Sequence, residues 1–204
     1  MRILLRIVAM TLLVLAIGCQ RDSAGPLDKI AAKAGSPTGR SDMAADIVAG
    51  FRAKKFGIGN AIDAAHKRLE SAAAGSSGLS PDAAASRAAT EFAGAVLDAT
   101  RQLESTLPTG GEHEIFWMQV GRLAFRASEE AFANQRVSEA RSLVFGGGKR
   151  WQNEPYWTRY SDHDGLASAI LAAEGERSEA ISRLQNRPNL SGVALEVFEK
   201  LTGR

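Results

Sequence analysis

Apolar residues recur every three or four positions along most of the chain, in stretches separated by glycine, proline and polar residues. This spacing places apolar side chains on one face of a helix. It predicts a first helix that begins after the capping pair Ser41-Asp42, and a second over about 60–74. A third helix is expected between Ser80 and Pro108, because Ser80 is a good N-cap and proline is well tolerated at the next position.

The second half of the chain continues the helical pattern. Its predicted helices are one from about Phe116 to a turn at Asn134-Gln135, followed by 138–144, 165–173, 177–184 and 192–201. Abundant alanine supports these assignments, since alanine loses no side-chain entropy in a helix. No stretch alternates between apolar and polar residues as a half-buried strand does. The expected fold is therefore all-α with essentially no β-sheet, built as helical hairpins or as an irregular helical bundle.

A weak internal repeat with a period of 40 residues runs through the second half. Trp117 corresponds to Trp157, Ala127-Ser128 to Ala167-Ser168, and 138–140 to 178–180. Periods of this size are typical of stacked helical hairpins. Residues 166–184, with small residues in both helices and Gly175 at the turn, resemble a degenerate tetratricopeptide repeat. That resemblance covers about residues 115–185 and implies a scaffold that binds peptide or protein segments in a concave groove, without catalysis.

The first nineteen residues have the pattern of an export signal. Arg2 and Arg6 precede an apolar stretch over residues 7–18, which is shorter than the ~20 residues of a membrane-spanning helix. The run Leu15-Ala16-Ile17-Gly18-Cys19 resembles the bacterial lipobox. This resemblance implies cleavage before Cys19 and acylation of that cysteine. Gln20 after the cysteine implies sorting to the periplasmic face of the outer membrane, if the source is Gram-negative.

These features divide the chain into four expected parts: a signal peptide (1–18), a lipidated cysteine with a flexible tether (19–40), N-terminal helices (41–110) and tetratricopeptide-like hairpins (111–204). Glycine and proline with few large apolar residues are the basis for the tether. Without Arg2 and Arg6, basic and acidic residues are equal in number, 23 each. A neutral mature chain gives no electrostatic reason to expect nucleic acid as a partner.

The segment 151–160 concentrates aromatic residues in a polar connection. It contains Trp151, Tyr156, Trp157 and Tyr160, with Arg159 among them. Aromatic residues and arginine dominate the energetics of protein interfaces. These five residues are the predicted partner-binding surface, although the aromatic rings would serve equally well to cover the helical core or to stack on the sugar rings of cell-wall glycan.

Two short acidic segments contain histidine, Glu112-His113-Glu114 and Asp162-His163-Asp164. Together they would offer ligands for a divalent metal or groups for hydrolysis. Each also has a simpler explanation: acidic residues complement the start of a helix, and Asp162 or Asp164 would cap the helix that begins near Gly165. His66, beside Lys67 and Arg68, is expected on a solvated face.

The expected function is that of a membrane-tethered helical adaptor in a bacterial envelope, which is not an enzyme and needs no cofactor. It would contact the membrane through lipid on Cys19 and bind an envelope protein. Two alternatives remain open. One is a metal-binding or hydrolytic lipoprotein that uses residues 112–114 and 162–164. The other is a cell-wall glycan binder that uses the aromatic segment.

Overall fold

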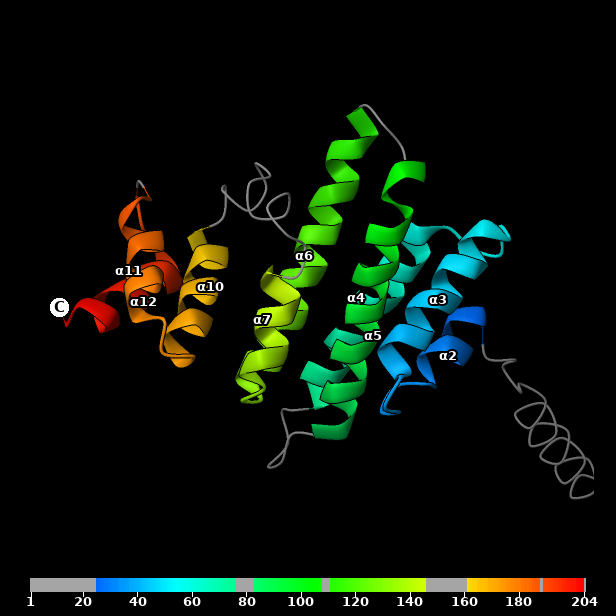
Figure 1. Ribbon diagram of the computed structural model, residues 1–204, viewed down its shortest axis with the longest axis horizontal. Coiled ribbons are helices and arrows are strands. Elements are labelled where there is room, and N and C mark those ends of the chain that lie inside the picture. The colour runs from blue at the N-terminus through cyan, green and yellow to red at the C-terminus, as the bar shows by residue number, and fades with distance from the viewer. Residues whose placement is uncertain (1–24, 76–82, 108–110, 146–160, 188, 204) are drawn as a thin grey trace, which may run out of the picture.

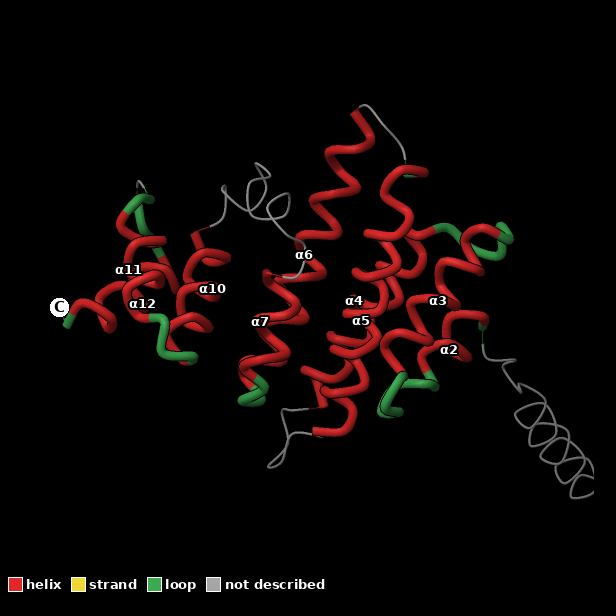
Figure 2. Tube along the Cα trace, in the orientation of Figure 1, coloured by secondary structure: helices red, strands yellow, loops and turns green. Residues whose placement is uncertain are grey.

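The computed structural model describes residues 25–75, 83–107, 111–145, 161–187 and 189–203 (Figure 1). Within these ranges the chain is helical, with turns and short loops between helices and no strand (Figure 2). The all-α prediction is therefore confirmed. The elements are α2 (Pro26–Ala31), α3 (Gly39–Arg52), α4 (Ile58–Gly75), α5 (Ala83–Leu103), a 3-10 turn η1 (Glu104–Thr106), α6 (Gly111–Ala133), α7 (Val137–Phe145), α10 (Ser161–Ala173), α11 (Arg177–Gln185) and α12 (Gly192–Thr202).

Residues 25–40 correct the prediction of a tether up to residue 40. They contain α2 and the start of α3, and the side chain of Ile30 is buried in the core. Asp28 on α2 also forms an ion pair with Arg68 on α4. Leu27, Ala31 and Ala34 also pack on the core, and Lys33 forms an ion pair with Asp46 of α3. These contacts hold a segment that composition alone assigns to a linker. Residues 19–24 lie outside the described residues.

The start of α3 is also earlier than predicted. Thr38, rather than Ser41 or Asp42, occupies the N-cap position, and its hydroxyl donates a hydrogen bond of 2.7 Å to the Asp42 carboxylate. Asp42 thus lies in the first turn, where its charge complements the helix dipole. The predicted start of α5 at Ser80 lies outside the described residues.

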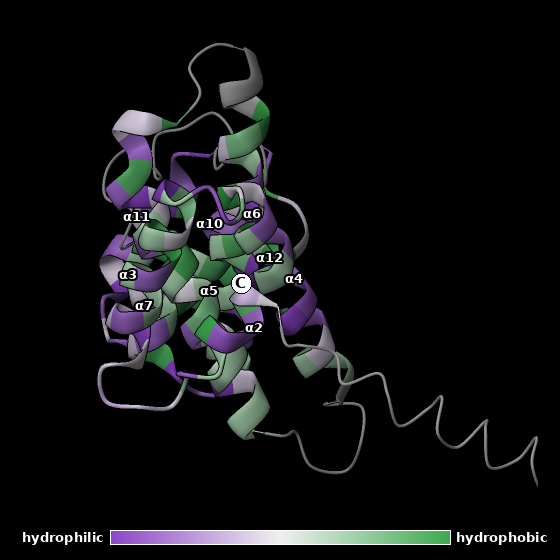
Figure 3. Cartoon of the chain, turned by 90° about the vertical axis from the view of Figure 1, so that its right-hand side faces the viewer, coloured by the Kyte–Doolittle hydropathy of each residue, from purple (hydrophilic) through white to green (hydrophobic). Residues whose placement is uncertain are grey.

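The helices follow one another from α2 at one end of the molecule to α12 at the other (Figure 1). Viewed from the end, α3, α7 and α11 lie on one side and α4, α6 and α12 on the other, with α5 and α10 between them (Figure 3). Successive elements are in contact: α4 and α5 pack on α6, and α10 packs on both α6 and α7. The N-terminal helices and the C-terminal hairpins therefore form one continuous stack.

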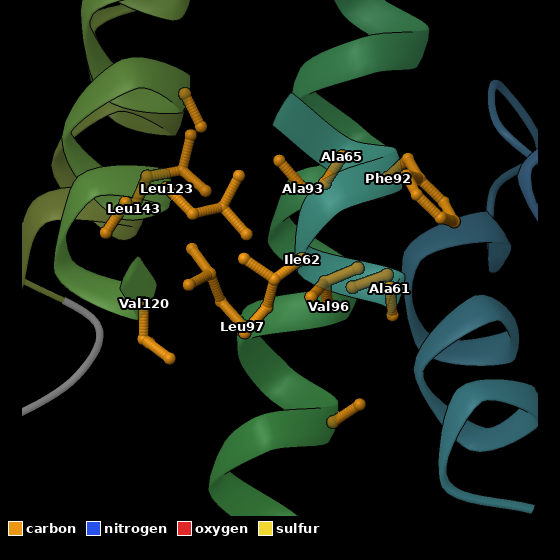
Figure 4. Close-up of a cluster of buried hydrophobic side chains, with 14 of the residues drawn as sticks. Ala61, Ile62, Ala65, Phe92, Ala93, Val96, Leu97, Val120, Leu123 and Leu143 are labelled. Atoms are coloured by element: carbon orange, nitrogen blue, oxygen red, sulfur yellow. The ribbon is translucent and has the colours of Figure 1, made fainter. Parts of the chain in front are cut away.

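The core combines large aliphatic side chains with many alanines. Figure 4 shows Ile62 and Ala65 of α4 facing Ala93, Val96 and Leu97 of α5, with side chains of α6 and α7 beyond. All of these side chains are buried. Small residues at the contact let helix backbones approach closely, so the core gains dispersion contacts rather than large buried area per residue.

The two C-terminal hairpins turn in the same way, 40 residues apart. Gln135 and Gly175 both have positive φ, 60° and 88°. After each, a backbone N–H donates to the carbonyl five residues earlier, Arg136 to Ala131 and Glu176 to Leu171, both at 2.9 Å. These are the hydrogen bonds of a helix C-terminal Schellman motif. The internal repeat thus corresponds to a repeated local structure, while membership in the tetratricopeptide family stays a prediction.

Gly165 sets the distance between α10 and α12. A Cβ atom at this position would lie 2.7 Å from the backbone nitrogen of Ala194 and 2.8 Å from its Cα. Backbone atoms cannot rotate away as a side chain can, so a larger residue would push α12 outward. Gly121 in α6 is the opposite case, because a Cβ there would meet no atom within 4 Å.

We therefore expect Gly165→Ala to destabilise the protein by about 1–3 kcal/mol through overpacking. Gly121→Ala is the matched control and should stabilise it by about 1 kcal/mol, because alanine is the better helix former. Urea unfolding of the full chain, followed by circular dichroism, measures both. Equal effects of the two substitutions would show that the close contact between α10 and α12 does not limit stability.

Candidate functional site

A groove of about 650 Å³ runs along the seam between α4 and α6, on the side of the molecule that Figure 3 shows opposite α7 and α11. One residue each from α10 and α12 contributes to its wall. The lining residues are Ile62, Asp63, His66, Glu70, Gln119, Arg122, Phe125, Arg126, Glu129, His163 and Val193. The groove is thus built by helices from four different parts of the stack, as a concave binding surface of a hairpin array would be.

The apolar surface of the groove comes from residues that also belong to the helix contacts. Ile62 is buried, Phe125 is half-buried, and the ring of Phe125 lies 4.3 Å from that of His163, centroid to centroid. Val193 of α12 adds an aliphatic side chain that is 47% exposed. Phe125 and Val193 therefore offer apolar contacts to the side chains of a bound segment, whereas Ile62 contributes little because it is only 1% exposed.

His66 lies in the groove and is half-buried, which corrects its prediction as part of a solvated face. Burial lowers the pKa of His66 below its ordinary value, and the guanidinium of Arg122 acts in the same direction. The backbone of Gln119 and the carboxylates of Glu70 and Asp63 oppose this shift. Because burial dominates, the imidazole is uncharged at neutral pH.

Charged side chains line the two long walls of the groove. Asp63 and Glu70 are exposed on α4, and Arg122 and Arg126 are exposed on α6. Arg126 forms an ion pair of 2.9 Å with Glu129, one turn along the same helix. The groove therefore combines a modest apolar surface with a larger polar and charged one.

Asp164 has a different role from the predicted helix cap. Because α10 begins at Ser161, Asp164 lies inside the first turns of the helix, where it is 1% exposed. Its two carboxylate oxygens face Nε of Arg183 at 2.9 Å and Nε of Arg187 at 2.6 Å. This cluster fastens α10 to the C-terminal end of α11, and sequence reasoning missed it because nothing local relates Asp164 to arginines about twenty residues away.

His163 is 8% exposed and packs on Phe125, so it contributes a ring to the groove. The side chains of Glu112, His113, Glu114 and Asp162 lie outside the described part of the chain. Among the side chains that the structure does describe, no group of three or more histidine, cysteine or carboxylate residues could hold a metal ion.

The predicted lipidation site and partner-binding surface also lie outside the described residues. This applies to Cys19, and to Trp151, Tyr156, Trp157, Arg159 and Tyr160. The described structure instead forms a groove from residues that the sequence pattern did not single out. The i, i+3 and i+7 spacing of Gln119, Arg122 and Arg126 does mark an exposed stripe of α6, but the facing residues of α4 follow only from the fold.

No protein-family model, curated protein or solved structure matches this chain. None of the described helices combines the length and apolar character needed to cross a membrane.

We expect Asp164→Asn to destabilise the protein by about 3 kcal/mol, because it leaves two arginines facing a neutral group in a largely buried place. Asp63→Asn removes an exposed carboxylate and should change stability by less than about 0.5 kcal/mol. Urea unfolding of the two variants compares them directly. A small effect of Asp164→Asn would mean that packing alone holds α10 against α11.

Proposed function

We propose that this protein is a membrane-tethered helical adaptor of a bacterial envelope, which binds a segment of a protein partner in the groove between α4 and α6. The observation that carries the proposal is the groove itself. It is formed by helices from successive hairpins, it combines apolar with polar and charged side chains, and its volume of about 650 Å³ has room for several side chains.

The repeated hairpin turns at Gln135 and Gly175 support the same proposal. Hairpins that stack on their neighbours leave one long surface made of equivalent helices, and such surfaces bind extended or helical segments of other proteins. The aromatic residues of 151–160 follow α7 in the chain and remain a second candidate surface for the same partner.

The tether is the other half of the proposal. It depends on the lipobox resemblance at residues 15–19 and on lipid attached to Cys19. A single acyl chain binds membranes only marginally, so stable anchoring would need more than one chain on this residue.

A photoreactive amino acid in place of Arg122, in the full chain expressed in its native cells, should form a covalent adduct with one envelope protein. The matched control is the same substitution at Arg87, an exposed arginine on α5 outside the groove. A third position, Trp157, tests the aromatic segment. Adducts of equal yield from Arg122 and Arg87, or an adduct at twice the mass of the chain, would contradict the proposed adaptor.

Cells fed an alkyne-tagged fatty acid should incorporate the tag into the wild-type chain and not into Cys19→Ser, because Cys19 is the only lipidated residue that the lipobox resemblance predicts. In-gel fluorescence after coupling to a dye measures the incorporation. A labelled Cys19→Ser chain, or an unlabelled wild type, would contradict the lipid tether without bearing on the groove.

A further inference from the structure

The two walls of the groove differ in charge. On α4, Asp63 and Glu70 are exposed carboxylates, and neither forms an ion pair with another described residue. On α6, the ion pair with Glu129 balances Arg126, so Arg122 supplies the net charge of that wall. An arginine keeps its positive charge at any physiological pH, and no described acidic residue pairs with it here.

His66 lies between the two walls and does not cancel this difference. Its lowered pKa keeps the imidazole neutral near pH 7, so the carboxylates of α4 face the groove without a compensating cation from their own helix. On the same face of the molecule, Phe125 and Val193 provide apolar surface between and beside the charged rims. The groove therefore has apolar surface from Phe125 and Val193, negative charge along α4 and positive charge along α6.

We propose that the groove binds an amphipathic segment of its protein partner in one chain direction, with apolar side chains in the groove, an acidic edge along α6 and a basic edge along α4. The inference rests on the proposed function, because it specifies the chemistry of the segment that the same groove would bind. The direction follows from geometry. A segment that is turned end for end, with its apolar face still inward, exchanges its two edges and places each charge beside a wall of the same sign.

The selectivity would come from repulsion as much as from attraction. Exposed ion pairs contribute little each, typically below about 1 kcal/mol. A reversed segment, however, loses the favourable pairs and gains like-charge contacts at the same positions, so the difference between the two directions is larger than any one pair. The structure thus favours a groove whose charges select the direction of the bound segment, rather than a groove whose charges give high affinity.

The test is a displayed library of random short peptides, selected on the purified full chain in detergent micelles. Peptides enriched on the wild type should carry apolar residues flanked by acidic residues on one edge and basic residues on the other. Arg122→Glu should weaken these peptides about fivefold or more, since it replaces a pair with a repulsion. Arg87→Glu, outside the groove, is the matched control and should change their affinity by less than about twofold.

The decisive variant inverts both walls, with Asp63→Lys, Glu70→Lys and Arg122→Glu combined. It should bind the wild-type peptides turned end for end, so that a photoreactive group at a peptide's N-terminus attaches to the opposite end of the groove from its site on the wild type. Since all three side chains are exposed, far-UV circular dichroism should remain that of the wild type. Enriched peptides with no charge difference between their edges, or equal effects of Arg122→Glu and Arg87→Glu, would overturn this inference and leave the proposed function standing. A groove that enriches no peptide, and forms no adduct from position 122 in cells, would overturn both.

Discussion

The distance at which two helix backbones can meet governs this structure. Alanines and glycines occupy the contacts between helices: Ala61 and Ala65 on α4, Ala93 on α5, and Gly165 against Ala194 at the junction of α10 and α12. Close approach of this kind maximises dispersion contacts between backbones but buries little apolar area per residue. Larger buried side chains, such as Phe92, Leu97 and Leu123, fill the space beside these close contacts.

A core of this type makes polar contacts between elements more important. Asp164 fastens α10 to α11 through Arg183 and Arg187, and Arg40 of α3 donates two hydrogen bonds to Asp98 of α5. Arg141 of α7 pairs with Glu176 at 2.7 Å, in the turn before α11. Each of these pairs joins separate elements. Asp164 is 1% exposed, whereas the side chains of Arg141 and Glu176 are 38% and 37% exposed and are screened by solvent. The ion pairs therefore specify which helices meet, while the alanines determine how closely they meet.

Local signals predicted most of the helices, because a helix is set by residues near each other in the chain. Gly175 and Ser191 mark the ends of elements that the structure places as α10, α11 and α12. The errors arose where a distant partner decides the outcome. Ile30 looks like part of a linker until α3 and α4 cover it, His66 looks solvated until α6 lies beside it, and Asp164 looks like a cap until two arginines of another helix reach it. The groove was missed for the same reason, since its walls come from helices more than fifty residues apart in the chain.

The docking of α2 has a consequence for the proposed anchor. With Ile30 buried and Gly25 already donating a hydrogen bond to Asp28, the folded body begins only six residues after Cys19. Even a fully extended chain of that length spans no more than about 20 Å. Lipid on Cys19 would thus hold the helical stack close to the bilayer, at a distance no greater than roughly the width of the stack. A partner in the same membrane would then meet the groove at a far higher effective concentration than a partner diffusing through the periplasm.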